Sequence, residues 1–141
     1  MIKKATQEDF EQIKSIMDNC VHPSWSVTVL KTAIEDKNNC FFVSTYNSDI
    51  DGYICLETCI DEASLSSIAV LPEKRNKGIA SALIETAFIE CKKRGINRCL
   101  LEVEETNLPA LKLYEKKGFR QISIRANYYG ESGAVIMERM I

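Results

Sequence analysis

The sequence lacks the features that mark membrane, secreted and nucleic-acid-binding proteins. No apolar run approaches the roughly 18 residues that a membrane-spanning helix needs. The opening segment, MIKKATQEDF, has no apolar core of the kind found in signal peptides. The formal net charge is −2, whereas a protein that binds a nucleic-acid backbone needs a basic face. These absences predict a cytoplasmic protein that has neither a membrane nor a nucleic acid as its partner.

Histidine is almost absent, since His22 is the only one, and the six cysteines form no close CxxC pair. A zinc site usually brings tighter ligand pairs, and a disulfide framework is typical of small secreted chains. We therefore expect no metal site, and reduced, buried cysteines that act as small hydrophobic residues. A catalytic thiol is the alternative, and it would need His22 as its partner. The cysteines are Cys20, Cys40, Cys55, Cys59, Cys91 and Cys99.

The composition is that of a protein with a real core. Hydrophobic residues make up 45% of the 141 residues and charged residues 27%, which suits one compact domain over residues 1–141. Alternation, helical spacing and turn residues predict the order β-α-α-β-β-β-α-β-α-β-β. The expected strands are residues 2–5, 40–46, 52–60, 64–71, 97–105, 119–126 and 134–141, and the expected helices are 10–20, 27–34, 79–94 and 108–117.

Capping residues support the helix boundaries. Thr6 and Asp9 resemble a capping box, Ser26 and Asn107 are good N-caps, and Gly95 follows a basic last turn. The strand–helix–strand unit at the centre must cross over right-handed, so strands 64–71 and 97–105 should be parallel. The unbroken apolar centre of the second is typical of a strand buried on both faces. The expected fold class is α/β (α+β), with a mixed, mostly antiparallel seven-stranded sheet.

The helix that begins in LPEKRNKGIASALIETAF carries Arg75, Lys77 and Gly78 at its mouth. A helix N-terminus presents unpaired N–H groups and partial positive charge, and a glycine lets an anion approach the backbone closely. Together with the two basic side chains, these groups can hold a pyrophosphate. The segment has neither the Walker spacing nor the dinucleotide fingerprint. Taken alone, RNKGIA is equally consistent with a solvated helix start.

The wider context is SSIAVLPEKRNKGIASALIETAFIECKKRG followed by LEVEETNLPALKLYEKKGF, and together they resemble the GNAT superfamily of acyl-CoA-dependent N-acetyltransferases. The first stretch is similar to its strand–loop–helix motif, in which Arg75, Gly78 and Ala80 occupy the signature positions. The second stretch is similar to its strand–Asn–helix–Tyr motif. Within the superfamily, IAV, LEV, NYY and WS resemble the ribosomal-protein-alanine N-acetyltransferases, with Glu102 twelve residues before Tyr114. Ser24 separates Pro23 from the WS pair, whereas the family usually has proline directly before it.

The resemblance implies acetyl-CoA as co-substrate, without a metal. The two central parallel strands should splay, often through a bulge, so that the first can pair with the pantetheine arm. Asn107 would cap its helix and also contact the pantetheine. The implied cofactor-binding residues are Ile68, Ala69 and Val70 on the strand, Arg75, Asn76, Lys77, Gly78, Ile79 and Ala80 at the helix start, and Asn107.

The resemblance also implies the catalytic groups. Glu102 would be the general base, directly or through a water, and burial among apolar neighbours would make it a better base near neutral pH. If the resemblance to the family is set aside, the simpler interpretation of Glu102 is a glutamate at the end of a strand that faces water. Tyr114 would be the general acid that protonates the leaving sulfur. Its position on a helix face with Ala110 and Leu111 is equally typical of a core aromatic.

The acceptor implied by the resemblance is the N-terminal alanine of a small-subunit ribosomal protein. Trp25, Tyr128 and Tyr129 are the candidate substrate contacts, although adjacent strand residues face opposite ways, so at most one tyrosine should line the cleft. Asp61 and Glu62 could attract a cationic amine. Transfer to a small amine or a lysine, and acyl-CoA binding without turnover, are the alternatives; intact Glu102 and Tyr114 argue against the last. We expect a monomer or weak dimer.

Overall fold

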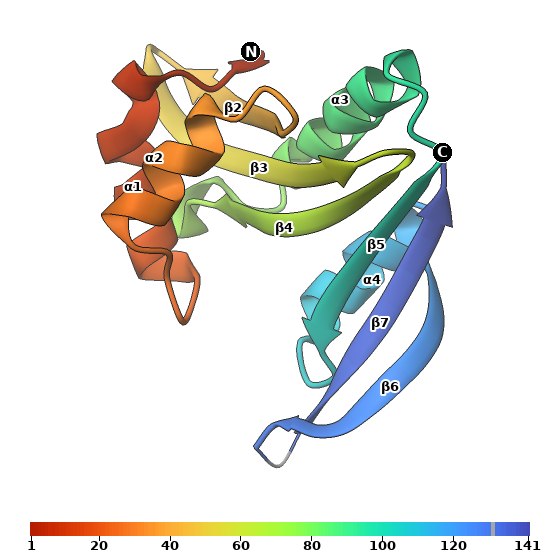
Figure 1. Ribbon diagram of the computed structural model, residues 1–141. Helices are drawn as coiled ribbons and strands as arrows, with labels where there is room; N and C mark the ends of the chain where they lie inside the picture. The colour runs from red at the N-terminus through yellow and green to blue at the C-terminus, as the bar shows by residue number, and fades with distance from the viewer. Residues whose placement is uncertain (131) are drawn as a thin grey trace.

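The protein, described by a computed structural model, folds around one seven-stranded sheet in the order β1-β2-β3-β4-β5-β7-β6 (Figure 1). The described residues are 1–130 and 132–141, without the side chains of residues 127–129. The strands are β1 Ile2–Lys4, β2 Cys40–Tyr46, β3 Asp49–Cys59, β4 Glu62–Val70, β5 Arg98–Glu104, β6 Arg120–Tyr129 and β7 Ser132–Met140. The helices are α1 Phe10–Cys20, α2 Val27–Glu35, α3 Ile79–Lys93 and α4 Leu108–Lys116, with 3-10 turns at Gln7–Asp9 and Pro72–Lys74. The predicted order of strands and α-helices is confirmed.

The predicted caps lie where the helices begin. The Ser26 hydroxyl accepts a hydrogen bond from the Val29 N–H at 3.2 Å, and the Asn107 side chain accepts one from the Ala110 N–H at 3.3 Å. The Asp9 carboxylate accepts from the Thr6 N–H at 2.9 Å, although a 3-10 turn separates this capping box from α1. Helix starts are therefore set by local chemistry that the sequence displays.

Two predicted connections are shorter than expected. The turn after β2 contains only Asn47 and Ser48, both with positive φ, so β3 begins at Asp49 rather than at Gly52. A two-residue turn of this kind matches the strand twist and keeps the ladder paired. Likewise β6 continues through NYY and β7 begins at Ser132, because Tyr129 still pairs with Ser132.

The centre of the sheet splits. Parallel β4 and β5 are in register only where Glu62, Ala63 and Ser64 face Arg98, Cys99 and Leu100. Beyond that point β4 stays with β3, while β5 pairs with β7, and the sheet opens into a V (Figure 1). The β3–β4 register shifts between Cys55, opposite Ser67, and Leu56, opposite Leu65, which leaves Ser66 as a bulge. The predicted splayed parallel pair and its bulge are confirmed.

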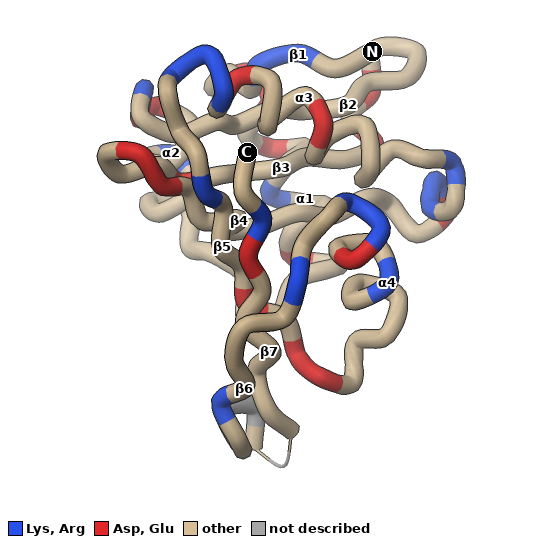
Figure 2. Tube along the Cα trace, turned by 90° about the vertical axis from the view of Figure 1, so that its right-hand side faces the viewer, with Lys and Arg blue, Asp and Glu red and all other residues tan. Residues whose placement is uncertain are grey.

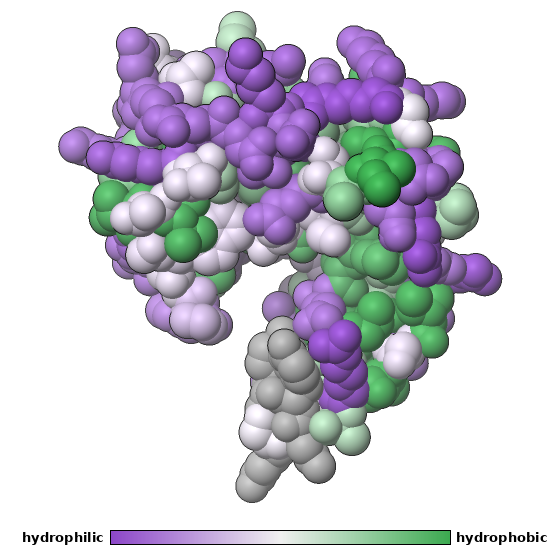
Figure 3. Space-filling view, viewed as in Figure 1, coloured by the Kyte–Doolittle hydropathy of each residue, from purple (hydrophilic) through white to green (hydrophobic). Residues whose placement is uncertain are grey.

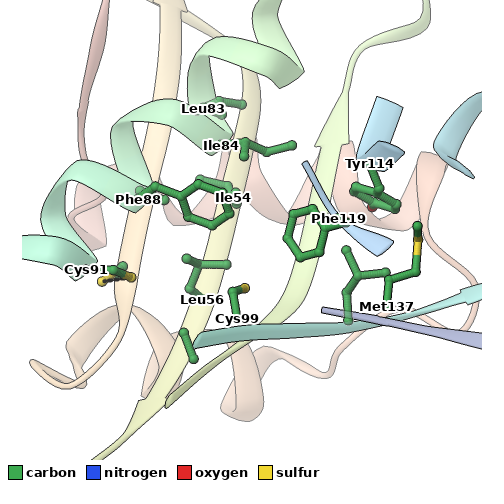
Figure 4. Close-up of a cluster of buried hydrophobic side chains, with 14 of the residues drawn as sticks. Ile54, Leu56, Leu83, Ile84, Phe88, Cys91, Cys99, Tyr114, Phe119 and Met137 are labelled. Carbon is green, nitrogen blue, oxygen red and sulfur yellow. Dashed lines mark hydrogen bonds between the residues drawn. The ribbon is translucent and has the colours of Figure 1, made fainter. Parts of the chain in front are cut away.

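One hydrophobic cluster spans both arms of the V. Side chains of α3 such as Leu83 and Phe88 pack with Leu101 of β5 and with Tyr114 and Phe119 (Figure 4). A second cluster joins α1 and α2 to the other face of β2, β3 and β4; it includes Ile13, Met17, Leu30, Val43 and Tyr53. In Figure 1, α1 and α2 therefore cover one face of the first arm, while α3 and α4 lie behind the sheet.

The prediction that β5 is buried on both faces is wrong. Its residues alternate, with Cys99, Leu101 and Val103 buried and Glu102 exposed. The reason is the V: the face of β5 that carries Glu102 looks into the opening instead of onto a helix. Burial of that face would require the two arms to be closed.

All six cysteines are free thiols. Burial as small hydrophobic residues is confirmed for Cys40, Cys55, Cys91 and Cys99. It is wrong for Cys59, which is exposed at the end of β3, and for half-buried Cys20.

Acidic and basic residues are interleaved along the chain, including on the neighbouring strands β5, β7 and β6 (Figure 2). On these strands Arg98 and Arg120 each lie 2.8 Å from the Glu138 carboxylate, and they hold the pKa of Glu138 below its usual range. Among the described residues, none of the helices has both the length and the apolar character needed to cross a membrane.

Candidate functional site

A cavity of about 710 Å³ lies where β4 and β5 part, between β4, the start of α3, and α4. Every predicted cofactor-binding residue except Lys77 lines it, and so does Tyr114. The remaining lining residues, which the sequence did not single out as ligands, are Cys20, Lys74, Ser81, Pro109, Ala110, Leu113 and Lys116. Pro109, Ala110 and Leu113 could have been found from helical spacing, since they share α4 with Asn107 and Tyr114.

One wall of the cavity is an open strand edge. Val70, Ala69 and Ile68 pair with Gly52, Tyr53 and Ile54 of β3 on one side. On the other side the register with β5 ends at Ser64, and further along the same edge Ile68, Ala69 and Val70 line the cavity. An extended ligand with amide groups can pair with such an edge as an added strand does.

A second wall is the start of α3. The turn before it bends through Asn76, with φ 61°, and Gly78, with φ 82°, and the first residues of the helix line the cavity. A Cβ built on Gly78 would meet no atom within 4 Å, so glycine is favoured there by its backbone angle and not by crowding. Free N–H groups, the helix dipole and nearby Lys74 and Arg75 suit a pyrophosphate.

Arg75 has a bracing contact that the sequence did not reveal. Its Nε donates to the Val70 carbonyl at 3.0 Å, and its Nη2 lies 3.5 Å from the Cys20 sulfur. The guanidinium therefore ties the end of α1 to the end of β4 at the rim of the cavity. Cys20 could not have been placed here from sequence, because only the tertiary fold brings α1 to this strand.

Tyr114 belongs both to the core and to the cavity. Its ring packs edge-on against Phe119, with centroids 5.8 Å apart, and only 7% of the residue is exposed (Figure 4). Burial raises the pKa of the Tyr114 hydroxyl to about 12, with a smaller contribution from nearby Cys99. The two interpretations of this residue are thus compatible: the ring packs in the core, and the phenol stays protonated near neutral pH beside the cavity.

Glu102 is not buried, contrary to the expectation from its apolar neighbours. Alternation along β5 turns Leu101 and Val103 into the core and Glu102 outward, where 36% of its side chain is exposed. Its Oε1 lies 3.2 Å from Nη1 of Arg125 on β6. Glu102 is therefore held in an ion pair at the open face of the V and is not enclosed by apolar side chains.

The opening opposite the cavity is a hollow between the α1–α2 end of the molecule and the β6–β7 hairpin (Figure 3). Trp25 lies half-buried in the α1–α2 connection. Its backbone N–H donates to the Met17 sulfur at 3.4 Å. The side chains of Tyr128 and Tyr129 lie outside the described residues. The prediction that Asp61 and Glu62 attract a cationic amine at this opening is wrong. Both residues lie at the closed end of the V, where Glu62 pairs with Arg98.

Comparison with known proteins agrees with this geometry. The sequence model of the Acetyltransferase (GNAT) family matches residues 6–119. The ribosomal protein bS18-alanine N-acetyltransferase of Haemophilus influenzae is 34% identical over 135 residues, which cover 92% of this chain and 90% of that relative. The protein of the same name from Escherichia coli K12 is 38% identical over 100 residues, 68% of each chain.

A solved structure has the same fold. The crystal structure of the ribosomal-protein-S18-alanine N-acetyltransferase from Escherichia coli has a TM-score of 0.91 at 30% identity, covering 100% of this chain and 93% of that one. The family match takes in most of the chain, including the open β4 edge, the α3 start and the tyrosine of α4. The chain therefore belongs to the acetyltransferase (GNAT) family and is an N-acetyltransferase.

Proposed function

We propose that the protein transfers the acetyl group of acetyl-CoA to the N-terminal α-amino group of a ribosomal protein, with alanine as the acceptor residue. The observation that carries the proposal is the cavity in which the open edge of β4, the start of α3 and Tyr114 meet. The relatives named for alanine acetylation on ribosomal protein bS18 support the same acceptor here.

The donor would lie along the split. Its pantetheine amides would pair with the backbone of Ile68, Ala69 and Val70, and Asn107 would contact the same arm from α4. The pyrophosphate would sit on the N–H groups from Arg75 to Ala80. This arrangement needs no particular side chain on β4, since an extended chain is recognised by its peptide groups. The thioester would then lie near Tyr114, at the point where the two arms diverge.

The reaction would be direct attack in a ternary complex. As the amine nitrogen bonds to the acetyl carbon, the carbon–sulfur bond breaks, Glu102 takes a proton from the amine, and Tyr114 gives its proton to the departing thiolate. An α-amino group has a pKa of about 8, against about 10.4 for lysine. An N-terminal amine is therefore already partly neutral near pH 7. A solvent-exposed base has to remove a proton from a smaller fraction of such amines than of lysine side chains.

Acetyl transfer onto a peptide panel tests the proposal. The panel contains peptides with a free N-terminal alanine, the same peptides with a blocked N-terminus and an internal lysine, and free polyamines. We expect transfer to the free N-termini, with kcat/KM at least tenfold above that for either control class. Faster transfer to polyamines or to lysine would leave the acetyltransferase activity in place and refute the acceptor.

A further inference from the structure

The ion pair between Glu102 and Arg125 lies at the open face of the V, on the side away from the cavity. Arg125 Nη1 is 3.2 Å from Glu102 Oε1, and the two side chains are 57% and 36% exposed. An ion pair this exposed contributes little to stability. A role in folding is therefore a poor explanation for bringing a cation to this carboxylate.

The strand register directs Arg125 to Glu102 across β7. Arg125 of β6 pairs with Ala134, which in turn faces Glu104, while Glu102 faces Ile136 one row further along. The guanidinium therefore reaches diagonally over β7. The β6–β7 register shifts directly after Arg125, and such an irregularity re-aims the side chains beside it.

The end of β5 is fixed to the same hairpin by backbone contacts. The Gly133 N–H donates to the Glu105 carboxylate at 2.9 Å, and the Glu105 N–H donates to the Gly133 carbonyl at 2.9 Å. A Cβ on Gly133 would lie 2.9 Å from the Arg125 carbonyl oxygen, which shows how closely the strands approach here. Glu102 and Arg125 are thus held on a tightly joined piece of sheet.

Neighbouring charges have other partners. Glu104 accepts a hydrogen bond from the Ser132 hydroxyl at 2.6 Å, and Glu138 pairs with Arg98 and Arg120. The ion pair of Arg125 with Glu102 lies beside these contacts, within the same group of strands.

We propose that Arg125 is a positioning residue that holds the Glu102 carboxylate by Oε1, so that Oε2 faces the acceptor amine. The proposal rests on the proposed function, in which Glu102 is the base. When the amine nitrogen bonds to the acetyl carbon, its proton passes to Oε2, and the ion pair keeps the carboxylate from rotating away. Misplacement of a catalytic group by about 1 Å can cost about 100-fold in rate.

The first test compares Arg125→Gln with Arg120→Gln. Arg120 also lies on β6, is 76% exposed in its side chain and pairs with Glu138, so its substitution removes an ion pair of the same strand without touching Glu102. We expect Arg125→Gln to lower kcat about 10- to 100-fold, with the KM for acetyl-CoA and the melting temperature unchanged. Arg120→Gln should keep the wild-type kcat, and Arg125→Lys should recover part of the loss. Equal rates for Arg125→Gln and wild type would overturn the proposal.

A double-mutant cycle with Glu102→Gln gives the decisive result. It is run on whichever acceptor the wild-type protein acetylates, so that the result does not depend on the acceptor proposed above. If Arg125 acts through Glu102, adding Arg125→Gln to Glu102→Gln should change kcat less than twofold. A full additional loss in that background would mean that Arg125 contacts the acceptor itself, which overturns the positioning role. Wild-type activity in Glu102→Gln alone would also overturn it, while acetyl transfer as the proposed function would stand.

Discussion

The two sides of the split in the sheet are built in different ways. The cavity side consists of a strand edge, a helix start and one helix face, drawn from the segment between Ile68 and Tyr114 together with Cys20 and Lys116. The open side carries the ion pair between Glu102 on β5 and Arg125 on β6. Backbone supplies the first side and long-range side-chain pairing the second. The difference teaches that donor binding should be separable by mutation from the proton transfer proposed for Glu102.

The largest expected effect is on the open side. Glu102→Gln keeps the size of the side chain but removes the proposed base, and we expect turnover to fall by roughly 10²–10⁴, the usual range for loss of a general base. Binding of acetyl-CoA should stay within twofold, because Glu102 does not line the cavity. Steady-state kinetics together with calorimetric titration of acetyl-CoA measure both. Full activity from pH 6 to 9 would show that another group takes the proton.

Tyr114→Phe is the matching change on the cavity side. It removes one oxygen and leaves the ring against Phe119, so the melting temperature should change little while turnover falls by a factor similar to that for Glu102→Gln. Since burial raises the pKa of Tyr114 to about 12, the wild-type acid stays protonated through pH 10. The wild-type rate should therefore rise as the acceptor amine is deprotonated and then stay level to pH 10.

Melting temperature and turnover of the phenylalanine variant should come from one preparation. Wild-type turnover in that variant would leave Tyr114 as a core aromatic only. A fall in the wild-type rate between pH 8 and 10 would likewise contradict a protonated tyrosine that persists at high pH.

Gly78→Asp should disable donor binding without altering the open side. The substitution places a side chain with negative charge at the proposed anion site, and we expect the thermal protection by acetyl-CoA to disappear. Gly95→Asp is the matched control: Gly95 ends the same helix, has φ 77° against 82° for Gly78, and also has no atom within 4 Å of an added Cβ. Both variants bear the same backbone strain, so equal protection in the two would refute the anion site.

The smallest expected effect concerns the hairpin. Gly133→Ala brings a Cβ within 2.9 Å of the Arg125 carbonyl, so the strands must move apart. We expect a loss of about 1–3 kcal/mol in the free energy of unfolding, typical of overpacking, and a several-fold fall in turnover through the Glu102–Arg125 pair. Gly130→Ala adds backbone strain, because φ is 69° there, but its Cβ meets nothing within 4 Å, so it should keep the turnover. Equal turnover in both variants would show that the packing of the β6–β7 hairpin does not affect catalysis.

The contrast between the two sides also explains what the sequence could predict. Ser26, Asn107 and the right-handed crossover act locally or by a general rule, so helix starts and the parallel central pair followed from the residues alone. The burial of Glu102 was predicted wrongly because LLEVE has apolar neighbours whichever way the strand faces, and only the V decides. Cys20 and Arg125 could not be placed either, since each reaches the site through tertiary packing and register.

The parallel pairing between β4 and β5 is short, so a small change of angle at this junction is amplified along both arms of the V. Antiparallel pairing holds each arm together. The arms are joined within the sheet by three register pairs, the first of which is Glu62 with Arg98. With about 3.3 Å per residue, the seven residues of β5 form an arm of roughly 23 Å, so a rotation of about 5° at the junction would move the far end by about 2 Å. A change in the residues of these three pairs, at the closed end of the V, would therefore alter the width of the opening without touching Glu102 or Tyr114.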